Sequence, residues 1–409
     1  MKILYLHQYF KTPIEGGAVR SWYLAKSMVD AGHDVVMITS HNQPYAVSKT
    51  IDGITVHYLP VYYDNRLGFT GRILSFIKFF WLAFQKSKRE YSVDICYATS
   101  TPLTIGLLAW WLKKARRIPY VFEVRDLWPE APVQMGIVRN VLLKKLLYKM
   151  EALIYRHAEQ MVALSPGIRD GIEKVCADKP ITIIPNISDC DFFQPESKDP
   201  QLEKIFNVEN RFVVSYFGAA GPVNKLDYLV DIIRYCKHHS RDDLFFLIQA
   251  RGAELARIEK EIEALHWPYV HFLNYSGKDS LKNLLNVTDA VYISFDNKPV
   301  LQSNSPNKFF DSIASGKLCI VNTKGWIKEL IEREEFGFYA NPEVPGDFLR
   351  KLEPFIKDKT RLLTIHNRAR RTAEQYYSRD ILSARLLTIL EQCKTISASS
   401  ASAAYTRTA

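Results

Sequence analysis

The sequence predicts an α/β protein made of two Rossmann-like halves. Strand-like and helix-like segments alternate along the 409 residues, a polar, Pro-bearing stretch at 186–210 interrupts them, and a second alternating series follows. Strands that alternate with helices form a mostly parallel sheet covered on both faces. Because a chain of this length holds two domains of ordinary size, we expect domains at 1–190 and 195–375.

We predict each strand and helix from its pattern of apolar residues. Short runs rich in Val, Ile and Tyr predict strands in the first half at 2–6, 34–39, 56–60, 94–98, 120–124, 160–164 and 180–184. Helical periodicity lies between most of them at 18–31, 70–89, 102–116, 137–158 and 166–176. The second half gives strands at 212–217, 244–250, 270–273, 289–294 and 318–321. Its helices are expected at 224–238, 254–264 and 279–286, with a short one after Ser305.

The C-terminal part has helical periodicity at 360–373 and 380–393. We expect a helix at 376–396 that crosses back to the N-terminal domain. Residues 397–409 are rich in Ser, Ala and Thr, so we expect them to be disordered.

Composition narrows the class of protein. The 47% hydrophobic and 24% charged content is typical of a globular chain. Six cysteines without metal-type spacing suit a reducing cytoplasm. Residues 1–10 lack a signal-peptide core, and the apolar runs at 73–84 and 102–112 are shorter than the roughly 18 residues a spanning helix needs. We therefore expect a cytoplasmic protein.

Basic charge is concentrated in one region. Residues 66–149 hold 15 Lys and Arg against 5 acids, an excess equal to the +10 of the whole chain. Aromatic and aliphatic residues run through this block between Phe69 and Phe84. A basic, aromatic-rich helix is typical of peripheral attachment to anionic lipid, and a core helix with a solvated basic rim is the alternative. No nucleic-acid-reading module is present, so we expect no nucleic acid partner.

The stretch 303–316, SNSPNKFFDSIASG, lies between two predicted strands. Ser305 is a good N-cap, and Pro306 suits the first helical position. On a helical wheel the apolar residues Phe309, Phe310, Ile313 and Ala314 fall opposite Asn307, Lys308 and Asp311. A helix N-terminus at the carboxyl end of a parallel strand can hold phosphate, and Asp311 could accept hydrogen bonds from a sugar diol. The alternative is an ordinary surface helix.

A second motif, Arg125 to Glu130 (RDLWPE), follows the strand 120–124. Two carboxylates, a guanidinium and an indole lie where α/β proteins place ligands. Asp126 beside Arg125 is expected to stay ionised and could orient an acceptor hydroxyl or the sugar. The alternative is an Arg–Asp pair that caps the end of the strand.

Four further loops follow predicted strands. Gly16 and Gly17 let the backbone approach a ligand closely, and Arg20 follows them; the alternative is a flexible turn, since no G-x-G-x-x-G fingerprint is present. Gly218 and Asn224 lie between a strand and a helix, where Asn224 also fits a plain N-cap. Arg251, beside Gly252, has the fork suited to phosphate or is a surface arginine. Tyr275 follows the strand 270–273.

These motifs resemble the family 4 glycosyltransferases, retaining enzymes whose GT-B fold has two Rossmann-like domains facing across a cleft. The segments 125–130 and 303–316 are similar to the branch that builds bacterial O-antigen and capsule repeats. In the family a Glu-x7-Glu pair brackets the short helix, and its second acid holds the ribose of the nucleotide-sugar. Here Asp311 takes that place, and Ser303 stands at the first position.

The resemblance also assigns the other loops. It implies that Gly16, Gly17 and Arg20 lie near the acceptor and the diphosphate, and that the loop of Tyr275 holds the base. An Arg and a Lys usually grip the diphosphate where this chain has Ala219 and Asn224. We therefore expect Arg251 and Lys308 to compensate. Ser305, Pro306, Asn307, Gly218 and Gly252 complete the expected donor site.

Relatives with His-Asp in place of Arg125-Asp126 use that His to contact the 6-hydroxyl of the donor sugar. Its absence leads to the hypothesis that the donor is a 6-deoxy N-acetylaminosugar. No Asp-x-Asp motif or His/Asp cluster suggests a metal, so we expect neither metal nor cofactor. The resemblance implies front-side attack, with the donor phosphate accepting the proton.

The sequence thus predicts a glycosyltransferase that moves a sugar from a UDP-linked donor to a lipid-linked saccharide at the inner membrane surface. Asp126, Arg125 and Glu130 are the expected catalytic residues. One alternative is a nucleotide-sugar 2-epimerase of the same fold. The other is a non-catalytic basic protein that binds membranes.

Overall fold

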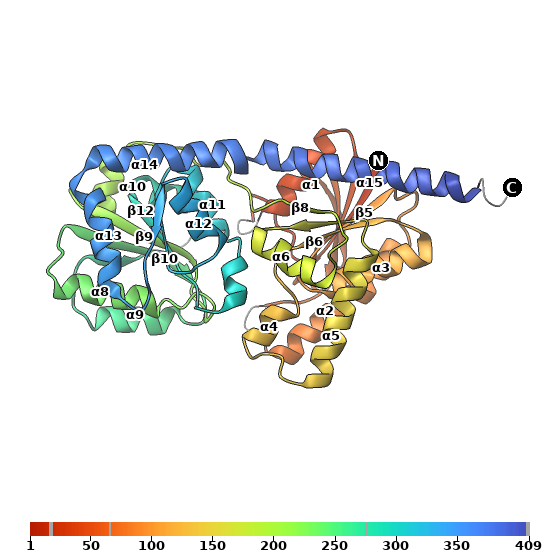
Figure 1. The fold of residues 1–409 in the computed structure, drawn as a ribbon, viewed down its shortest axis with the longest axis horizontal. Helices are drawn as coiled ribbons and strands as arrows, with labels where there is room; N and C mark the ends of the chain where they lie inside the picture. The colour runs from red at the N-terminus through yellow and green to blue at the C-terminus, as the bar shows by residue number, and fades with distance from the viewer. Residues whose placement is uncertain (16–18, 65–66, 275–276, 406–409) are drawn as a thin grey trace. The chain divides into compact units, whose positions relative to one another are not determined.

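The structure is a computed structural model that describes residues 1–15, 19–64, 67–274 and 277–405. The chain divides into two units, each with one sheet flanked by helices (Figure 1). The first unit comprises Met1–Pro185, Ser303–Ser305 and Asp380–Ala409; the second comprises Asn186–Gln302 and Pro306–Arg379. The predicted α/β class with two Rossmann-like halves is confirmed.

The first unit contains an eight-stranded sheet in the order β3-β4-β2-β1-β5-β6-β7-β8. Its strands are β1 (Lys2–Leu6), β2 (Asp34–His41), β3 (Val47–Ile51), β4 (Ile54–Pro60), β5 (Ile95–Thr99), β6 (Tyr120–Val124), β7 (Gln160–Ala163) and β8 (Ile181–Ile183). All pair in parallel except β3, which is antiparallel to β4. The helices between them are α1 (Arg20–Asp30), α2 (Phe69–Ser87), α3 (Thr104–Arg116), α4 (Glu130–Gln134), α5 (Val141–His157) and α6 (Pro166–Val175).

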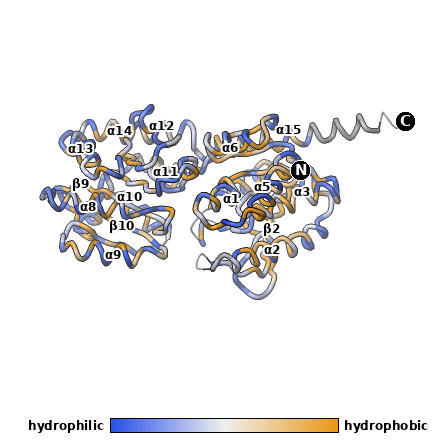
Figure 2. The backbone as a smooth tube through the Cα atoms, turned by 60° about the horizontal axis from the view of Figure 1, so that its bottom comes forward, coloured by the Kyte–Doolittle hydropathy of each residue, from blue (hydrophilic) through white to orange (hydrophobic). Residues whose placement is uncertain are grey.

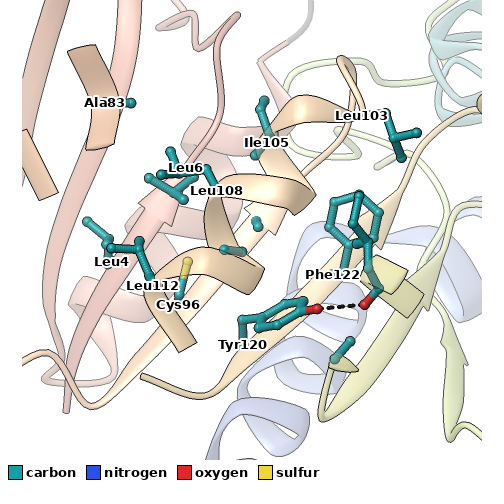
Figure 3. Packing of buried hydrophobic residues seen from close by; sticks show 14 of the residues in the cluster. Leu4, Leu6, Ala83, Cys96, Leu103, Ile105, Leu108, Leu112, Tyr120 and Phe122 are labelled. Atoms are coloured by element: carbon teal, nitrogen blue, oxygen red, sulfur yellow. Dashed lines mark hydrogen bonds between the residues drawn. The ribbon is translucent and has the colours of Figure 1, made fainter. Parts of the chain in front are cut away.

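The core of this unit lies between the sheet and α3, as Figure 3 shows for Leu4, Leu6, Leu108 and Phe122. Gly106 allows α3 to come this close, because a Cβ there would lie 2.8 Å from the Phe122 ring. The buried Tyr120 hydroxyl donates to the Ile154 carbonyl over 2.6 Å, which satisfies the polar end of an otherwise apolar ring (Figure 3).

Helix α15 (Arg379–Tyr405) groups with the first unit from Asp380 onward. Its buried face contains Leu382, Leu386, Leu390 and Cys393, and Lys394 lies 3.7 Å from Asp94. We expected residues 397–409 to be disordered; those up to Tyr405 belong to helix α15, and 406–409 lie outside the described residues. Alanine is a strong helix former, and extending an existing helix avoids the cost of nucleation.

The second unit contains a six-stranded parallel sheet in the order β11-β10-β9-β12-β13-β14. Its strands are β9 (Phe212–Ala219), β10 (Leu244–Arg251), β11 (Val270–Phe272), β12 (Ala290–Ile293), β13 (Leu318–Val321) and β14 (Gly337–Tyr339). Its helices are α7 (Pro200–Phe206), α8 (Asp227–His238), α9 (Leu255–Glu263), α10 (Lys278–Val287), α11 (Asn307–Ala314), α12 (Trp326–Arg333), α13 (Pro345–Lys357) and α14 (Lys359–Thr372). Hydrophilic and hydrophobic residues alternate along helices such as α9 (Figure 2).

Several elements were not predicted from the sequence. Strand β3 is an edge strand whose middle residues are polar and exposed, so it lacks an apolar signal. Helix α7 lies in the expected linker, where Asp199 accepts from the Gln201 N–H and caps a helix that begins with Pro200. Helices α4, α12 and α13 and strand β14 were also missed. None of the described helices is both long and apolar enough to cross a bilayer.

Candidate functional site

Helix α11 connects β12 to β13 in the second unit, and its predicted apolar face is confirmed. Phe309, Phe310, Ile313 and Ala314 are fully buried. The N-cap position is occupied by Pro306, not by Ser305, and Pro306 makes no side-chain hydrogen bond to the helix. The expected cap was wrong because the chain stays extended through Pro306, which has a ψ of 137°. Asn307, the first helical residue, is exposed.

Lys308 lies on the buried side of α11, which corrects its expected place on the open face. Its side chain is 7% exposed, and Nζ donates to Tyr216 Oη over 2.8 Å. The ammonium also lies 4.0 Å from the centre of the Tyr216 ring. Burial lowers the pKa of Lys308 to about 7, since water no longer solvates the charge. No carboxylate among the described residues acts on the Lys308 ammonium, since burial is the only cause of the shift in its pKa.

Gly218 makes room for this lysine at the carboxyl end of β9. Its φ is +115°, and a Cβ there would lie 3.3 Å from Lys308 Cε. The neighbouring Ala219 carbonyl accepts from Tyr216 Oη over 2.5 Å. A cation from α11 therefore lies beside Ala219, which occupies one of the two positions that carry positive charge in the resembled family.

The loops after β9 and β10 are joined by hydrogen bonds. The Ala220 N–H donates to the Arg251 carbonyl over 2.7 Å, and the Ala220 carbonyl accepts from Glu254 over 3.0 Å. Gly252 is required in this arrangement, because a Cβ there would lie 2.2 Å from the Ala220 oxygen. Arg251 is exposed at the carboxyl end of β10.

Asn224 is not an N-cap, which corrects the simpler of its two expected roles. Helix α8 begins at Asp227 with Leu226 at the cap position. Asn224 instead lies buried in the turn that follows β9, where its N–H donates to the Gly221 carbonyl over 2.9 Å.

Asp311 lies one turn into α11, near an ion pair that sequence reasoning missed. Lys278 pairs with Asp189, and its Nζ lies 4.2 Å from the Phe192 ring centre. Burial raises the pKa of Asp311 to about 7; Lys278 opposes this rise and Asp189 adds to it. The sequence signal was weak, because Asp189 lies in the expected linker and Lys278 begins a helix 33 residues before Asp311.

Asp126 occupies the carboxyl end of β6 in the first unit. Thr101 Oγ1 donates to Asp126 Oδ2 over 3.3 Å, and the Arg125 N–H donates to Ser100 Oγ over 2.9 Å. We expected Arg125 to dominate and keep Asp126 ionised. Although solvent reaches this side chain, enclosure by the protein outweighs Arg125 and raises the pKa of Asp126 above its ordinary value.

Glu130 is the first residue of α4, where a carboxylate is favoured by the helix dipole. Its Oε2 accepts from the Tyr148 hydroxyl over 2.5 Å, and its Oε1 accepts from Gln134 over 2.7 Å. One carboxylate oxygen therefore links α4 to α5, and the other makes a hydrogen bond within α4. These hydrogen bonds show that Glu130 helps to hold α4 against α5. Its catalytic role stays a prediction.

Arg20 was expected to lie near the acceptor and the diphosphate, but its side chain is buried against Glu123. It is 3% exposed, and its Nη2 lies 2.6 Å from Glu123 Oε1 and 2.9 Å from the Ile184 carbonyl. Glu123 Oε2 also accepts from Thr99 Oγ1 over 2.9 Å. The side chain turns inward because a carboxylate buried in β6 needs a counter-charge. Glu123 within the apolar strand YVFEV was the sequence signal for such a partner.

The remaining predicted residues are placed as follows. Gly16, Gly17 and Tyr275 lie outside the described residues. Ser303 is buried in the first unit, where its carbonyl accepts from Ser165 Oγ over 2.6 Å. Within the described parts of the chain, no group of three or more His, Cys, Asp or Glu could hold a metal ion.

Comparison with protein families gives two matches. Residues 15–187 match the family described as "Glycosyl transferase 4-like domain", and residues 197–375 match "Glycosyl transferases group 1". The chain is a GT-B glycosyltransferase. No curated protein matches the sequence.

Solved structures similar to this glycosyltransferase share its fold at low sequence identity. Sucrose-phosphate synthase from Thermosynechococcus elongatus is 15% identical with a TM-score of 0.77, over 96% of this chain and 98% of that one. Anabaena Alr3699/HepE in complex with UDP is 18% identical with a TM-score of 0.69, over 96% and 100%. WaaG, a glycosyltransferase involved in lipopolysaccharide biosynthesis, is 14% identical with a TM-score of 0.66, over 96% and 99%. The predicted GT-B fold and transferase class are confirmed.

Proposed function

We propose that this glycosyltransferase transfers a sugar from a UDP-linked donor to a lipid-linked saccharide in surface polysaccharide biosynthesis. The second unit binds the donor, and the first unit binds the acceptor. The observation that carries the donor part is the buried Lys308 ammonium at the strand ends, which has no carboxylate partner among the described residues. A diphosphate is the counter-charge that this position lacks.

The diphosphate would be held by three kinds of donor. Lys308 supplies a charge-assisted hydrogen bond, and Arg251 supplies a guanidinium from the neighbouring loop. The N–H groups in the first turn of α11 supply the positive end of the helix dipole. Asp311, one turn further, would accept hydrogen bonds from the ribose hydroxyls. UDP is bound by the similar Anabaena protein, which supports uracil as the base.

The transfer would proceed with retention and without a metal ion. Lys308, Arg251 and the helix N-terminus would stabilise the charge that develops on the leaving diphosphate. A donor phosphate oxygen would accept the proton of the attacking hydroxyl. Asp126, fixed by Thr101, would orient that hydroxyl, and Arg125 would occupy the region of the donor 6-position. The hypothesis of a 6-deoxy N-acetylaminosugar follows from this last assignment.

Membrane attachment is the second part of the proposal. On α2, Phe76, Phe79 and Phe80 are buried while Leu74 and Trp81 are exposed, so the helix has both a core face and exposed apolar side chains. On α5 the exposed apolar residues Val141, Leu142 and Leu146 lie among Lys144, Lys145 and Lys149. Apolar side chains beside lysines suit the surface of an anionic bilayer, where a lipid-linked acceptor is found.

The donor assignment is tested by thermal unfolding with UDP and with GDP. UDP should raise the melting temperature of the enzyme, because a ligand that binds only the folded state stabilises it. Incubation with a panel of UDP-sugars and a lipid-linked acceptor, followed by mass spectrometry, identifies the transferred sugar. Release of an epimer or free sugar without acceptor would instead indicate the epimerase. Comparable turnover with UDP-GlcNAc and its 6-deoxy analogue would count against the 6-deoxy hypothesis.

The acceptor side is tested by Asp126→Ala, with Asp34→Ala as an exposed control in the same unit. Asp126→Ala should lower kcat by about 100-fold, within the range for a positioned proton-handling group, while UDP affinity stays unchanged.

The membrane part is tested by sedimentation with vesicles that contain anionic lipid. Leu142→Ser combined with Leu146→Ser should reduce binding, whereas Ile205→Ser, an exposed apolar control in the second unit, should not.

A further inference from the structure

A cavity of about 1130 Å³ lies in the second unit, at the edge of the sheet opposite the proposed donor site. It is lined by Phe212, Asp289 and Lys317, which lie at or just before the first residues of β9, β12 and β13. Gly218 and Arg251, by contrast, lie at the carboxyl ends of β9 and β10. In a parallel sheet these two edges are separated by the length of the strands. The cavity is therefore distinct from the residues assigned to UDP.

Lys317 is a buried charged residue in the lining of this cavity. It directly follows Gly316, which has a φ of +63° and ends helix α11. Its side chain is only 5% exposed, yet its ammonium makes no hydrogen bond or ion pair with any residue that the structure describes. Burial lowers the pKa of Lys317 to about 8, which reflects how few solvating groups surround the charge.

A role as a helix cap does not account for this lysine. The Ser312 carbonyl accepts from the Lys317 backbone N–H over 2.9 Å, and the Ile313 carbonyl accepts from Gly316 over 3.0 Å. The Ala314 carbonyl accepts from Arg370 Nη1 over 2.6 Å. The last carbonyls of α11 are thus satisfied by other donors, and the Lys317 ammonium is left for the cavity.

The charges that act on the Lys317 ammonium are Asp289, Lys198 and Glu196. Asp289 Oδ2 already accepts from Lys198 Nζ over 2.6 Å and from the Val213 N–H over 2.8 Å. His366 Nε2 donates to the Asp289 carbonyl over 3.0 Å, and burial lowers the pKa of His366 to about 4, so the imidazole is neutral at pH 7. Asp289 is thus already paired with Lys198, and Glu196 pairs with Lys282 at 3.3 Å.

We propose that this cavity is a second ligand site, which binds a small metabolite carrying a phosphate or carboxylate group through the Lys317 ammonium. An oxyanion would supply the hydrogen-bond acceptors that the buried Lys317 ammonium lacks. Pro195, Phe212 and Leu362 give the cavity apolar walls that can contact the carbon skeleton of such a ligand. The site uses no residue of the proposed donor site and does not depend on that proposal.

The test is a calorimetric titration with inorganic phosphate and, separately, with acetate. All variants carry Lys308→Met, so that the cation of the proposed donor site cannot account for anion binding. Lys317→Met is compared with Lys359→Met, which removes the same charge from an exposed position on the same cavity. We expect saturable binding of at least one anion, weakened tenfold or more by Lys317→Met and within about twofold of the parent in Lys359→Met.

The proposal is overturned if neither anion binds saturably. It is also overturned if Lys317→Met and Lys359→Met bind anions alike, because the anions are then adventitious ions only. Near-ultraviolet circular dichroism establishes that Lys317→Met is folded, and Lys317→Gln provides a polar variant of similar reach. Loss of UDP binding in the Lys308→Met background does not affect this comparison. Failure of the donor assignment and failure of this proposal are therefore separable.

Discussion

Lys308 Nζ donates a hydrogen bond to Tyr216 Oη over 2.8 Å, and the Tyr216 hydroxyl in turn donates to the Ala219 carbonyl. Burial raises the pKa of Tyr216 far above its ordinary value, so the hydroxyl stays neutral and cannot compensate the ammonium. The structure therefore holds a buried cation in place by a hydrogen bond and a ring face. This pre-positioned charge is suited to an anion that arrives with the substrate.

Lys308→Met should weaken UDP binding by roughly 10- to 100-fold, because a hydrogen bond to a charged group contributes about 1.5–3 kcal/mol. The folded protein should be no less stable, since the substitution removes a buried charge that has no ion-pair partner. Isothermal titration calorimetry with UDP measures the effect. Lys260→Met, at an exposed position on α9, is the matched control and should bind UDP like the parent. Equal affinities in the two variants would contradict the diphosphate assignment.

Gly218→Ala should disturb the same cation through the backbone. The residue has a φ of +115°, and the new Cβ would lie 3.3 Å from Lys308 Cε. We expect a loss of stability of about 1–3 kcal/mol from backbone strain, together with weaker UDP binding. Gly221→Ala is the control in the same loop, because its φ is not positive and a Cβ there meets no atom within 4 Å. Thermal unfolding with and without UDP compares the two.

Asp311→Asn should change how stability depends on pH. The folded pKa of about 7 lies above the ordinary value of 3.8, so the folded state binds more protons than the unfolded state between these values. The contribution of Asp311 to stability is thus present below about pH 4 and is lost as pH rises through 7. The melting temperature of Asp311→Asn relative to the parent should increase over that range.

Asp347→Asn is the control of opposite sign. Lys351, the Asn341 N–H and Arg350 lower the pKa of Asp347 against the effect of burial. The stabilisation by Asp347 is therefore present above its unfolded pKa and is lost as pH falls through the folded one. Parallel pH profiles for the two variants would show that the pKa of Asp311 is not raised.

Asp311→Ala should also weaken binding of the nucleotide-sugar donor. If UDP affinity is unchanged in this variant, Asp311 does not bind the ribose.

Arg20→Ala should destabilise the first unit by about 3–5 kcal/mol, because it leaves the Glu123 carboxylate buried without its partner. Urea denaturation followed by tryptophan fluorescence measures the loss. Replacing both residues, as Arg20→Met with Glu123→Leu, should recover most of the stability. If Arg20→Ala instead leaves stability intact and weakens substrate binding, the side chain belongs to a ligand site as the sequence had suggested.

Elements with a strong apolar signal were predictable, and side-chain direction was not. Strand β13 begins and ends where the sequence placed it, at 318 and 321, because four buried residues lie between a glycine-containing turn and a polar one. Lys308 was placed on the wrong face of α11 because a helical wheel scores lysine as polar. Its burial depends on Tyr216 and Gly218, which lie about 90 residues earlier in the chain.

Long-range pairing limited the prediction of the first unit in the same way. The RDLWPE motif was correctly placed at the end of β6, since the strand before it is continuous and apolar. The partners of its residues were not predictable: Glu130 bonds to Tyr148, and Asp126 accepts from Thr101. Arg20 and Glu123 are separated by 103 residues, and only the folded sheet brings them together.

Helix α15 has a consequence for the order in which the protein can be made. The first unit contains residues 1–185 together with Asp380 onward, and Leu386 and Leu390 of that helix are fully buried. During synthesis, the apolar surface that Leu386 and Leu390 contact therefore stays uncovered until this helix has been made. The second unit, whose residues all precede Asp380 in the chain, can finish folding first.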